Sequence, residues 1–164
     1  MTKNFSEILG IPDTIVPQIK SFRFIEDSID ISSGNGVVET EIELTDDLSG
    51  VKHAFSYWKS PSGNQVTFFS NLVSGDSKIG KYKSSFTLNE FSEPGIWSLN
   101  RLHLSDEVNN KTNYYPDDFS RLGFQRGFSV IGSLPDTNAP QIKSFRFIED
   151  SIDISSGNGV VETE

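Results

Sequence analysis

The sequence predicts an all-β fold, an antiparallel β-sandwich of seven or eight strands. Apolar and polar side chains alternate over short stretches, which is typical of strands with one buried face. Clusters of Gly, Pro, Asn and Ser separate these stretches at fairly even intervals, and no helical pattern is long enough to compete. The chain contains no cysteine, so we expect a sandwich without a disulfide.

The first half of the chain supplies five expected strands, at residues 19–25, 29–31, 38–44, 51–59 and 65–72. Phe22 and Phe24 lie on one face of the first strand. The third has the clearest alternation, with apolar residues from Val38 to Leu44 separated by glutamates, and an Asn-Gly turn precedes it. The fourth is rich in aromatic residues and ends at a Ser-Pro-Ser-Gly-Asn turn.

The second half supplies three more, at residues 82–88, 97–104 and 128–131. The apolar parity of the 97–104 stretch shifts after Leu99, which predicts a β-bulge near Asn100. Residues 106–110 are expected to form a loop and residues 117–122 a helical turn. We expect Trp97 or Trp58 to fill the core between the sheets.

An internal repeat divides the chain. Residues 17–41 recur without a change at residues 140–164. We therefore expect a leader or linker at 1–16, a complete repeat at 17–139 and the truncated start of a second repeat at 140–164. The predicted partners are neighbouring copies of the repeat, as in a tandem array. Because the tail duplicates strands of the unit, we also expect it to mediate self-association by strand addition or domain swapping, or else to be a disordered tail.

The composition excludes several functions. A net charge of −9 argues against a nucleic-acid partner and an anionic membrane, and no apolar stretch is long enough for membrane insertion. The N-terminal residues show no secretion signal. With two histidines, no cysteine, no Gly-x-Ser-x-Gly motif and no carboxylate pair that stands out, we expect no enzyme activity.

Several short motifs carry a resemblance. They are TDDLSGV at 45–51, SPSGNQ at 60–65, GIW at 95–97, DEVNN at 106–110, LGF at 122–124 and DTNAP at 136–140. In this order they resemble an immunoglobulin-like tandem repeat of large surface and secreted proteins of marine bacteria and cyanobacteria. The resemblance implies an immunoglobulin-like sandwich outside the cell or on its surface, serving as a non-catalytic spacer or adhesin. Asn109 stands where the family usually has Gly, and Asn tolerates the left-handed backbone.

Acidic loops suggest calcium as the cofactor. The candidate ligands are Glu26, Asp27 and Asp30 in one loop, Asp46 and Asp47 in a second, Asp106, Asn109 and Asn110 in a third, and Asp136 in the linker, with Asp13 as its counterpart before the unit. No loop matches an EF-hand. The alternative is that these residues only form turns and caps and keep the surface soluble.

The alternative function is a carbohydrate-binding module that accompanies a secreted enzyme, with a glycan or another cell-surface molecule as ligand. Its candidate residues are Tyr57, Trp58, Tyr114 and Tyr115. Tyr57 and Trp58 must lie on opposite faces of an alternating strand, so we expect one in the core and the other partly exposed. Packing beneath a loop is the competing explanation for Tyr114 and Tyr115.

Overall fold

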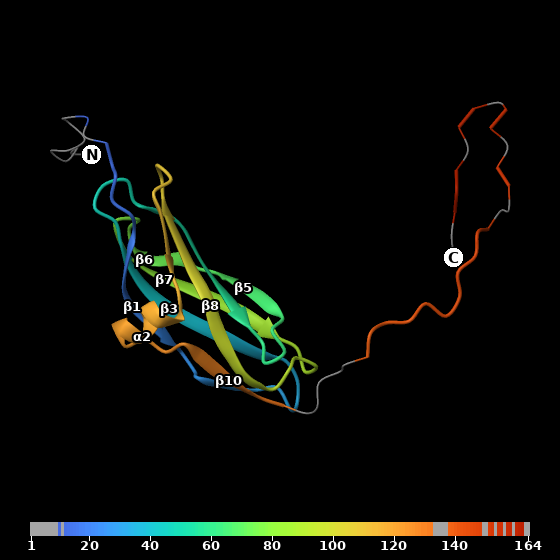
Figure 1. Cartoon of the computed structure of the whole chain (residues 1–164), viewed down its shortest axis with the longest axis horizontal. Helices are drawn as coiled ribbons and strands as arrows, with labels where there is room; N and C mark the ends of the chain where they lie inside the picture. Colours follow the sequence, from blue (N-terminus) through green and yellow to red (C-terminus); the bar gives the residue numbers. More distant parts are fainter. Residues whose placement is uncertain are drawn as a thin grey trace.

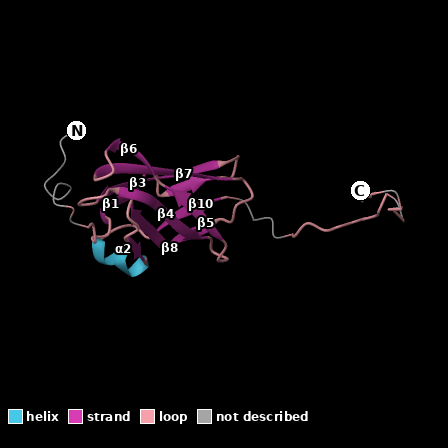
Figure 2. Ribbon diagram, turned by 90° about the horizontal axis from the view of Figure 1, so that it is seen from above, coloured by secondary structure: helices cyan, strands magenta, loops and turns pink. Residues whose placement is uncertain are grey.

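A computed structural model describes residues 10, 12–132, 138–148, 151–152, 154–155, 157–158 and 160–162 (Figure 1). In the described residues one sheet contains β1 (Gln18–Phe24), β3 (Gly36–Thr45), β7 (Ile79–Leu88) and β6 (Asn71–Gly75), in this order. The other contains β2 (Ser28–Asp30), β10 (Gly127–Ile131), β8 (Gly95–Asp106), β4 (Val51–Lys59) and β5 (Gln65–Phe69), and β9 (Lys111–Tyr114) pairs with β8. Neighbouring strands are antiparallel except β2 and β10. Figure 2 shows the two sheets packed together, with helix α2 (Pro116–Leu122) beside them.

The predicted all-β architecture of two packed sheets is confirmed, but the strand count of seven to eight is wrong, because the described residues form ten strands. The expected strand 65–72 breaks at Ser70, so β5 belongs to one sheet and β6 to the other. Every residue of β6 is exposed, so no alternation marks it. The four-residue β9 follows the expected loop and depends on pairing with the extended end of β8.

The core is an aromatic cluster between the sheets. The ring of Trp58 is fully buried and lies within 5.2–6.1 Å of Phe22, Phe24, Phe68 and Phe128, measured between centroids. Trp97 is buried as well and stacks on Phe128 at 5.9 Å. Burying each such ring stabilises the fold by about 1.5–3 kcal/mol, so this cluster is the main force that holds the two sheets together.

The predicted bulge at Asn100 is confirmed. Tyr57 pairs with Arg101 and Trp58 with Leu99, which leaves Asn100 as the extra residue of β8. The extra residue restores inward parity for Leu102 and Leu104, both buried. As a consequence, Arg101 faces outward beside Tyr57.

Helix α2 confirms the helical turn expected at 117–122. The carboxylate of Asp118 accepts a hydrogen bond from the Tyr115 N–H at 2.8 Å, which caps the first turn. Phe119 is fully buried and contacts Phe22, with ring centroids 5.1 Å apart. Gly123 ends the helix with a left-handed φ of 74°. One buried ring thus anchors the helix to the sandwich.

The described residues of the duplicated tail reproduce local contacts of the unit, although Figure 1 shows the tail apart from the sandwich. Phe145 and Phe147 lie 5.4 Å apart, as Phe22 and Phe24 lie 5.3 Å apart. The Ile148 N–H donates to the Glu162 carbonyl at 3.2 Å, the counterpart of a 2.9 Å bond in the unit. However, Phe145 and Phe147 are 61% and 54% exposed, against 9% and 5% for Phe22 and Phe24. Two local contacts of the unit therefore recur in the tail, although its described residues form no strand and its two rings are exposed.

Candidate metal centre

Three segments meet at the end of the sandwich where the chain enters β1: residues 12–17, the 46–50 loop and the 106–110 loop (Figure 1). The Asp13 carboxylate accepts hydrogen bonds from the N–H groups of Ser49 at 2.8 Å and Ile15 at 3.0 Å. The Asn110 side-chain amide donates to the Asp13 carbonyl at 3.1 Å. Residues 12–17 are therefore attached to the unit through both loops.

Asp46 has the most unusual carboxylate of this end. Its Oδ1 accepts hydrogen bonds from the N–H groups of Gly50 at 2.6 Å and Leu48 at 3.3 Å, which close the turn. Its Oδ2 is buried and has no hydrogen-bond partner among the described residues, and the residue as a whole is only 6% exposed. A buried carboxylate oxygen without a donor is costly, so this oxygen is suited to a cation.

Asp13, Asp46 and Asp47 form the cluster that could hold the ion. One carboxylate oxygen of each lies within 4.8 Å of the others. Three carboxylates can supply between three and six oxygens, and calcium takes about six to eight at 2.3–2.6 Å, the rest coming from water or backbone carbonyls. The hard oxygen donors and the absence of cysteine from the chain fit calcium better than zinc.

The electrostatics of the cluster point the same way. Desolvation by burial raises the pKa of Asp46, the negative charges of Asp13 and Asp106 add to this, and the hydrogen bonds from Gly50 and Leu48 only partly oppose it. Desolvation acts upward on Asp13 too, but the hydrogen bonds donated by Ser49 and Ile15 and the charge of Lys78 outweigh it and leave that pKa below its usual value. The electrostatic cost of burying negative charge is therefore greatest at Asp46, and a bound cation would reduce it.

The 106–110 loop positions the linker segment. Asp106 is fully buried, and its Oδ1 accepts from the N–H groups of Val108 at 3.0 Å and Asn110 at 2.8 Å. Its Oδ2 accepts from the Asn110 side-chain amide at 2.6 Å. Asn109 has a φ of 71°, which is a left-handed backbone conformation. This agrees with the expectation that Asn tolerates the conformation at a position where the similar family usually has Gly. Asp106 and Asn110 thus fix the loop that holds Asp13, while Asp106 adds negative charge near Asp46.

The remaining calcium candidates lie elsewhere. Glu26, Asp27 and Asp30 follow the far end of β1, whereas Gln18 at its start pairs with Thr45 beside the metal centre. The Asp30 carboxylate accepts from the Ser32 N–H at 2.8 Å, which is a turn interaction. Asp136 lies outside the described residues. Of the three acidic loops, the structure brings together the second and third, with Asp13 from the linker.

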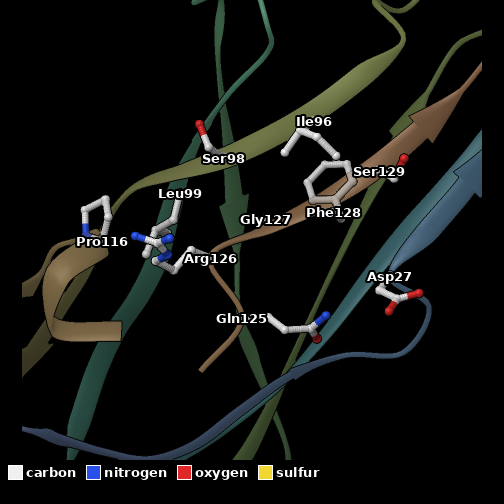
Figure 3. Close-up of a pocket in the computed structure, with 10 residues that line it drawn as sticks. All are labelled: Asp27, Ile96, Ser98, Leu99, Pro116, Gln125, Arg126, Gly127, Phe128 and Ser129. Carbon is white, nitrogen blue, oxygen red and sulfur yellow. The ribbon is translucent and has the colours of Figure 1, made fainter. Parts of the chain in front are cut away.

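Asp27 lines an open groove of about 670 Å³ on β8 and β10 (Figure 3). Ile96 and Ser98 of β8 form one wall, and Gln125 and Arg126 come from the segment before β10. Among the described residues that line the groove, Asp27 is the one with a carboxylate. The described lining thus contains one carboxylate, whereas glycosidases act with a pair.

The aromatic candidates separate into three environments. Trp58 is buried in the core and offers no ring face to a ligand, while Tyr57 is half-buried on the opposite face, so the predicted division between them is confirmed. Tyr114 packs against the core, and its hydroxyl accepts a 3.4 Å hydrogen bond from the Ile19 N–H. Tyr115 is 50% exposed just before α2. The packing explanation therefore fits Tyr114.

Sequence reasoning missed four residues that lie on the same outer face as Tyr57, which are Phe55, Phe69, Arg101 and His103. The strand parity of Phe55 is the same as that of Tyr57, and this signal could have identified it. Phe69 could not be placed beside Phe55, nor Arg101 beside Tyr57, without the strand register.

Residues 11–129 match the family described as Domain of unknown function (DUF7743). The chain belongs to this family. The matched region includes Asp13 and both loops of the metal centre, so the linker segment falls within the family's domain. Searches of curated proteins and of solved structures gave no match. None of the helices in the described part of the chain has the length and apolar character needed to cross a membrane.

Proposed function

We propose that this DUF7743 domain is an immunoglobulin-like repeat of a bacterial surface or secreted protein, a non-catalytic spacer or adhesin unit whose calcium ion ties the linker to the sandwich. The observation that carries the proposal is the unpartnered Oδ2 of Asp46, buried beside Asp13 and Asp47. The cluster combines Asp13 of the linker with Asp46 and Asp47 of the 46–50 loop. An ion at this point would cross-link two parts of the chain rather than activate a substrate.

The strand order supports the immunoglobulin-like assignment. The order β1-β3-β7-β6 corresponds to strands A, B, E and D, and β10-β8-β4-β5 to G, F, C and C′. The short β2 pairs in parallel with β10, as an A′ strand pairs with G. Trp58 is buried on β4, the position of strand C, where immunoglobulin domains carry a core tryptophan.

The internal repeat supports the spacer role. The Pro-Asp-Thr sequence that contains Asp13 recurs 123 residues later around Asp136, directly before the second copy of the β1 sequence. Each unit of such an array would receive its own linker aspartate. Because the ion joins that aspartate to the 46–50 loop, it would limit rotation between neighbouring copies and stiffen the array.

Isothermal titration calorimetry with calcium tests the proposal. The wild-type chain is expected to bind one ion with a Kd of about 10⁻⁴–10⁻³ M, as extracellular modules do. Asp47→Asn, at an exposed position of the cluster, is expected to weaken binding at least tenfold, whereas Glu26→Gln, at the other end of β1, should leave it unchanged. No heat at millimolar calcium, together with a melting temperature indifferent to chelation, would overturn the metal assignment.

A further inference from the structure

The outer face of the second sheet carries a cluster of rings that the metal centre does not use. We call this the aromatic face and define it by Phe55, Tyr57, Phe69, Arg101 and His103. Phe55 lies opposite Phe69 on β5 and opposite His103 on β8, and Tyr57 lies opposite Arg101. The Phe55 ring centroid is 4.7 Å from that of His103, 5.5 Å from Tyr57 and 5.9 Å from Phe69. Phe69 is 66% exposed, so its ring is accessible to a ligand.

Hydrogen-bonding groups surround these rings. The Arg101 guanidinium stacks over the Tyr57 ring at 4.7 Å, and its Nε is buried without a hydrogen-bond partner among the described residues. His103 Nδ1 lies 3.0 Å from the Asn113 side-chain oxygen. Because an amide oxygen only accepts, Nδ1 is the donor of this pair, which leaves Nε2 to hydrogen-bond with a ligand hydroxyl, a group that both donates and accepts. Stacking surfaces and hydroxyl partners thus occur together.

The charge of this face is opposite to that of the whole chain. Strands β4, β5 and β9 contain three lysines and no Asp or Glu, although the net charge is −9. Lys52 is paired with Glu107 at 3.4 Å, so Lys59 and Lys111 are the lysines that these strands offer to a ligand. On the outer face of the other sheet, by contrast, the acids are paired: Glu41 with Arg23 and Lys83, and Glu43 with Lys81. Local charge governs binding at contact distance, because salt screens charges beyond about 8 Å at physiological ionic strength.

The open groove continues the aromatic face. Ser98, which lines the groove, is the register partner of Lys59 on β4. Arg126 contributes another cation to the groove wall (Figure 3). A linear ligand could therefore extend from Phe69 across β4 and β8 to Arg126.

We propose that the aromatic face and its groove bind an acidic polysaccharide. Pyranose rings would stack on Phe69 and Tyr57, hydroxyl groups would hydrogen-bond to His103, and carboxylates would pair with Arg101 and Lys59. Arg101, Lys59 and Lys111 on these strands, with Arg126 in the groove, outnumber Asp27, the carboxylate among the described groove residues, and this excess of positive charge favours an acidic chain over a neutral one. The inference does not depend on the calcium site, since all of its residues lie outside the metal centre.

Affinity measurements with two matched hexasaccharides test it: β-1,4-linked glucuronate and cellohexaose, which differ in the C6 carboxylate. All titrations contain chelator, so that the metal centre plays no part. The wild-type chain is expected to bind the glucuronate hexamer more tightly, with an affinity that falls as salt rises. Arg101→Gln should weaken glucuronate binding about tenfold and change cellohexaose binding little. Phe69→Ala should weaken both by several-fold.

Phe91→Ala is the matched control, because Phe91 is 62% exposed but lies outside the aromatic face. It should leave both affinities unchanged, and the melting temperature of each variant verifies folding. Failure of both sugars to bind, or equal affinity for both without an effect of Arg101→Gln, would overturn the proposal. Calcium binding measured separately would still stand.

Discussion

Replacing Asp46 with Asn should separate the cost of this carboxylate from its use in binding a metal. The variant keeps Oδ1, so the hydrogen bonds from Gly50 and Leu48 remain. It removes the negative charge whose burial, near Asp13 and Asp106, raises the pKa of Asp46. In chelator we therefore expect the Asp46→Asn protein to melt at the same temperature as the wild type or above it, although most substitutions at buried positions destabilise.

Calcium should reverse this order. A ligand at about 100 times its Kd stabilises the folded state by about 2.7 kcal/mol. For a domain of this size, about 3–5 °C of melting temperature corresponds to 1 kcal/mol, so 10 mM calcium should raise the wild-type melting temperature by roughly 8–14 °C if Kd is about 0.1 mM. The variant should gain less than about 2 °C.

Differential scanning calorimetry in chelator and in calcium gives the four temperatures required. Magnesium at the same concentration controls for ionic strength, since its smaller ion fits the cluster less well. If the variant were strongly destabilised in chelator, Asp46 would be a structural turn residue. If both proteins gained equally from calcium, the ion would bind elsewhere.

Three further predictions concern pH, the loop and the tail. In chelator, the folded state holds the Asp46 proton more tightly than the unfolded state does, because the pKa of Asp46 is raised on folding. The stability of the wild type relative to Asp46→Asn should therefore fall as pH rises from the ordinary aspartate pKa of 3.8 through the raised pKa, as measured by urea unfolding at a series of pH values; a difference that does not change with pH would contradict the shift. Asn109→Gly should leave the free energy of unfolding nearly unchanged, whereas Asn109→Val should lower it by about 1–2 kcal/mol, because residue 109 has a left-handed φ of 71°. Equal effects of the two substitutions would show that the loop does not require a left-handed residue here. Light scattering should show self-association of the full chain and not of residues 1–139, because the exposed Phe145 and Phe147 match buried residues of the unit. A monomeric mass for both proteins would contradict domain swapping.

The sequence predicted best those elements whose signal is local. The alternation from Val38 to Leu44 and the parity shift at Asn100 each reflect which side chains face the core, and the structure has both features. Strand β6 gave no such signal, because all five of its residues are exposed and only its pairing with β7 makes it a strand. Strand β9 likewise depends on a partner, β8, that extends beyond the other strands.

The candidate metal centre was predictable by residue type but not by location. Three acidic loops looked equivalent in sequence, because each combines Asp with turn-forming neighbours. Which loops share an end of the sandwich depends on the direction of each strand, and only the topology places the 46–50 and 106–110 loops beside Asp13. The unpartnered Oδ2 of Asp46, which distinguishes a cation site from a turn, is a property of packing.

The two proposals together lead to a stronger consequence than either alone. A single aromatic face that stacks a few sugar rings would bind weakly, but a tandem array of such units would carry one face on each unit. Linked sites can bind 10²–10⁴ times more tightly than one site when their geometry allows simultaneous contact. Calcium, by fixing each linker aspartate to the 46–50 loop, would hold successive faces at a constant rotation. Polysaccharide binding by two joined units should therefore depend on calcium, whereas binding by one unit should not.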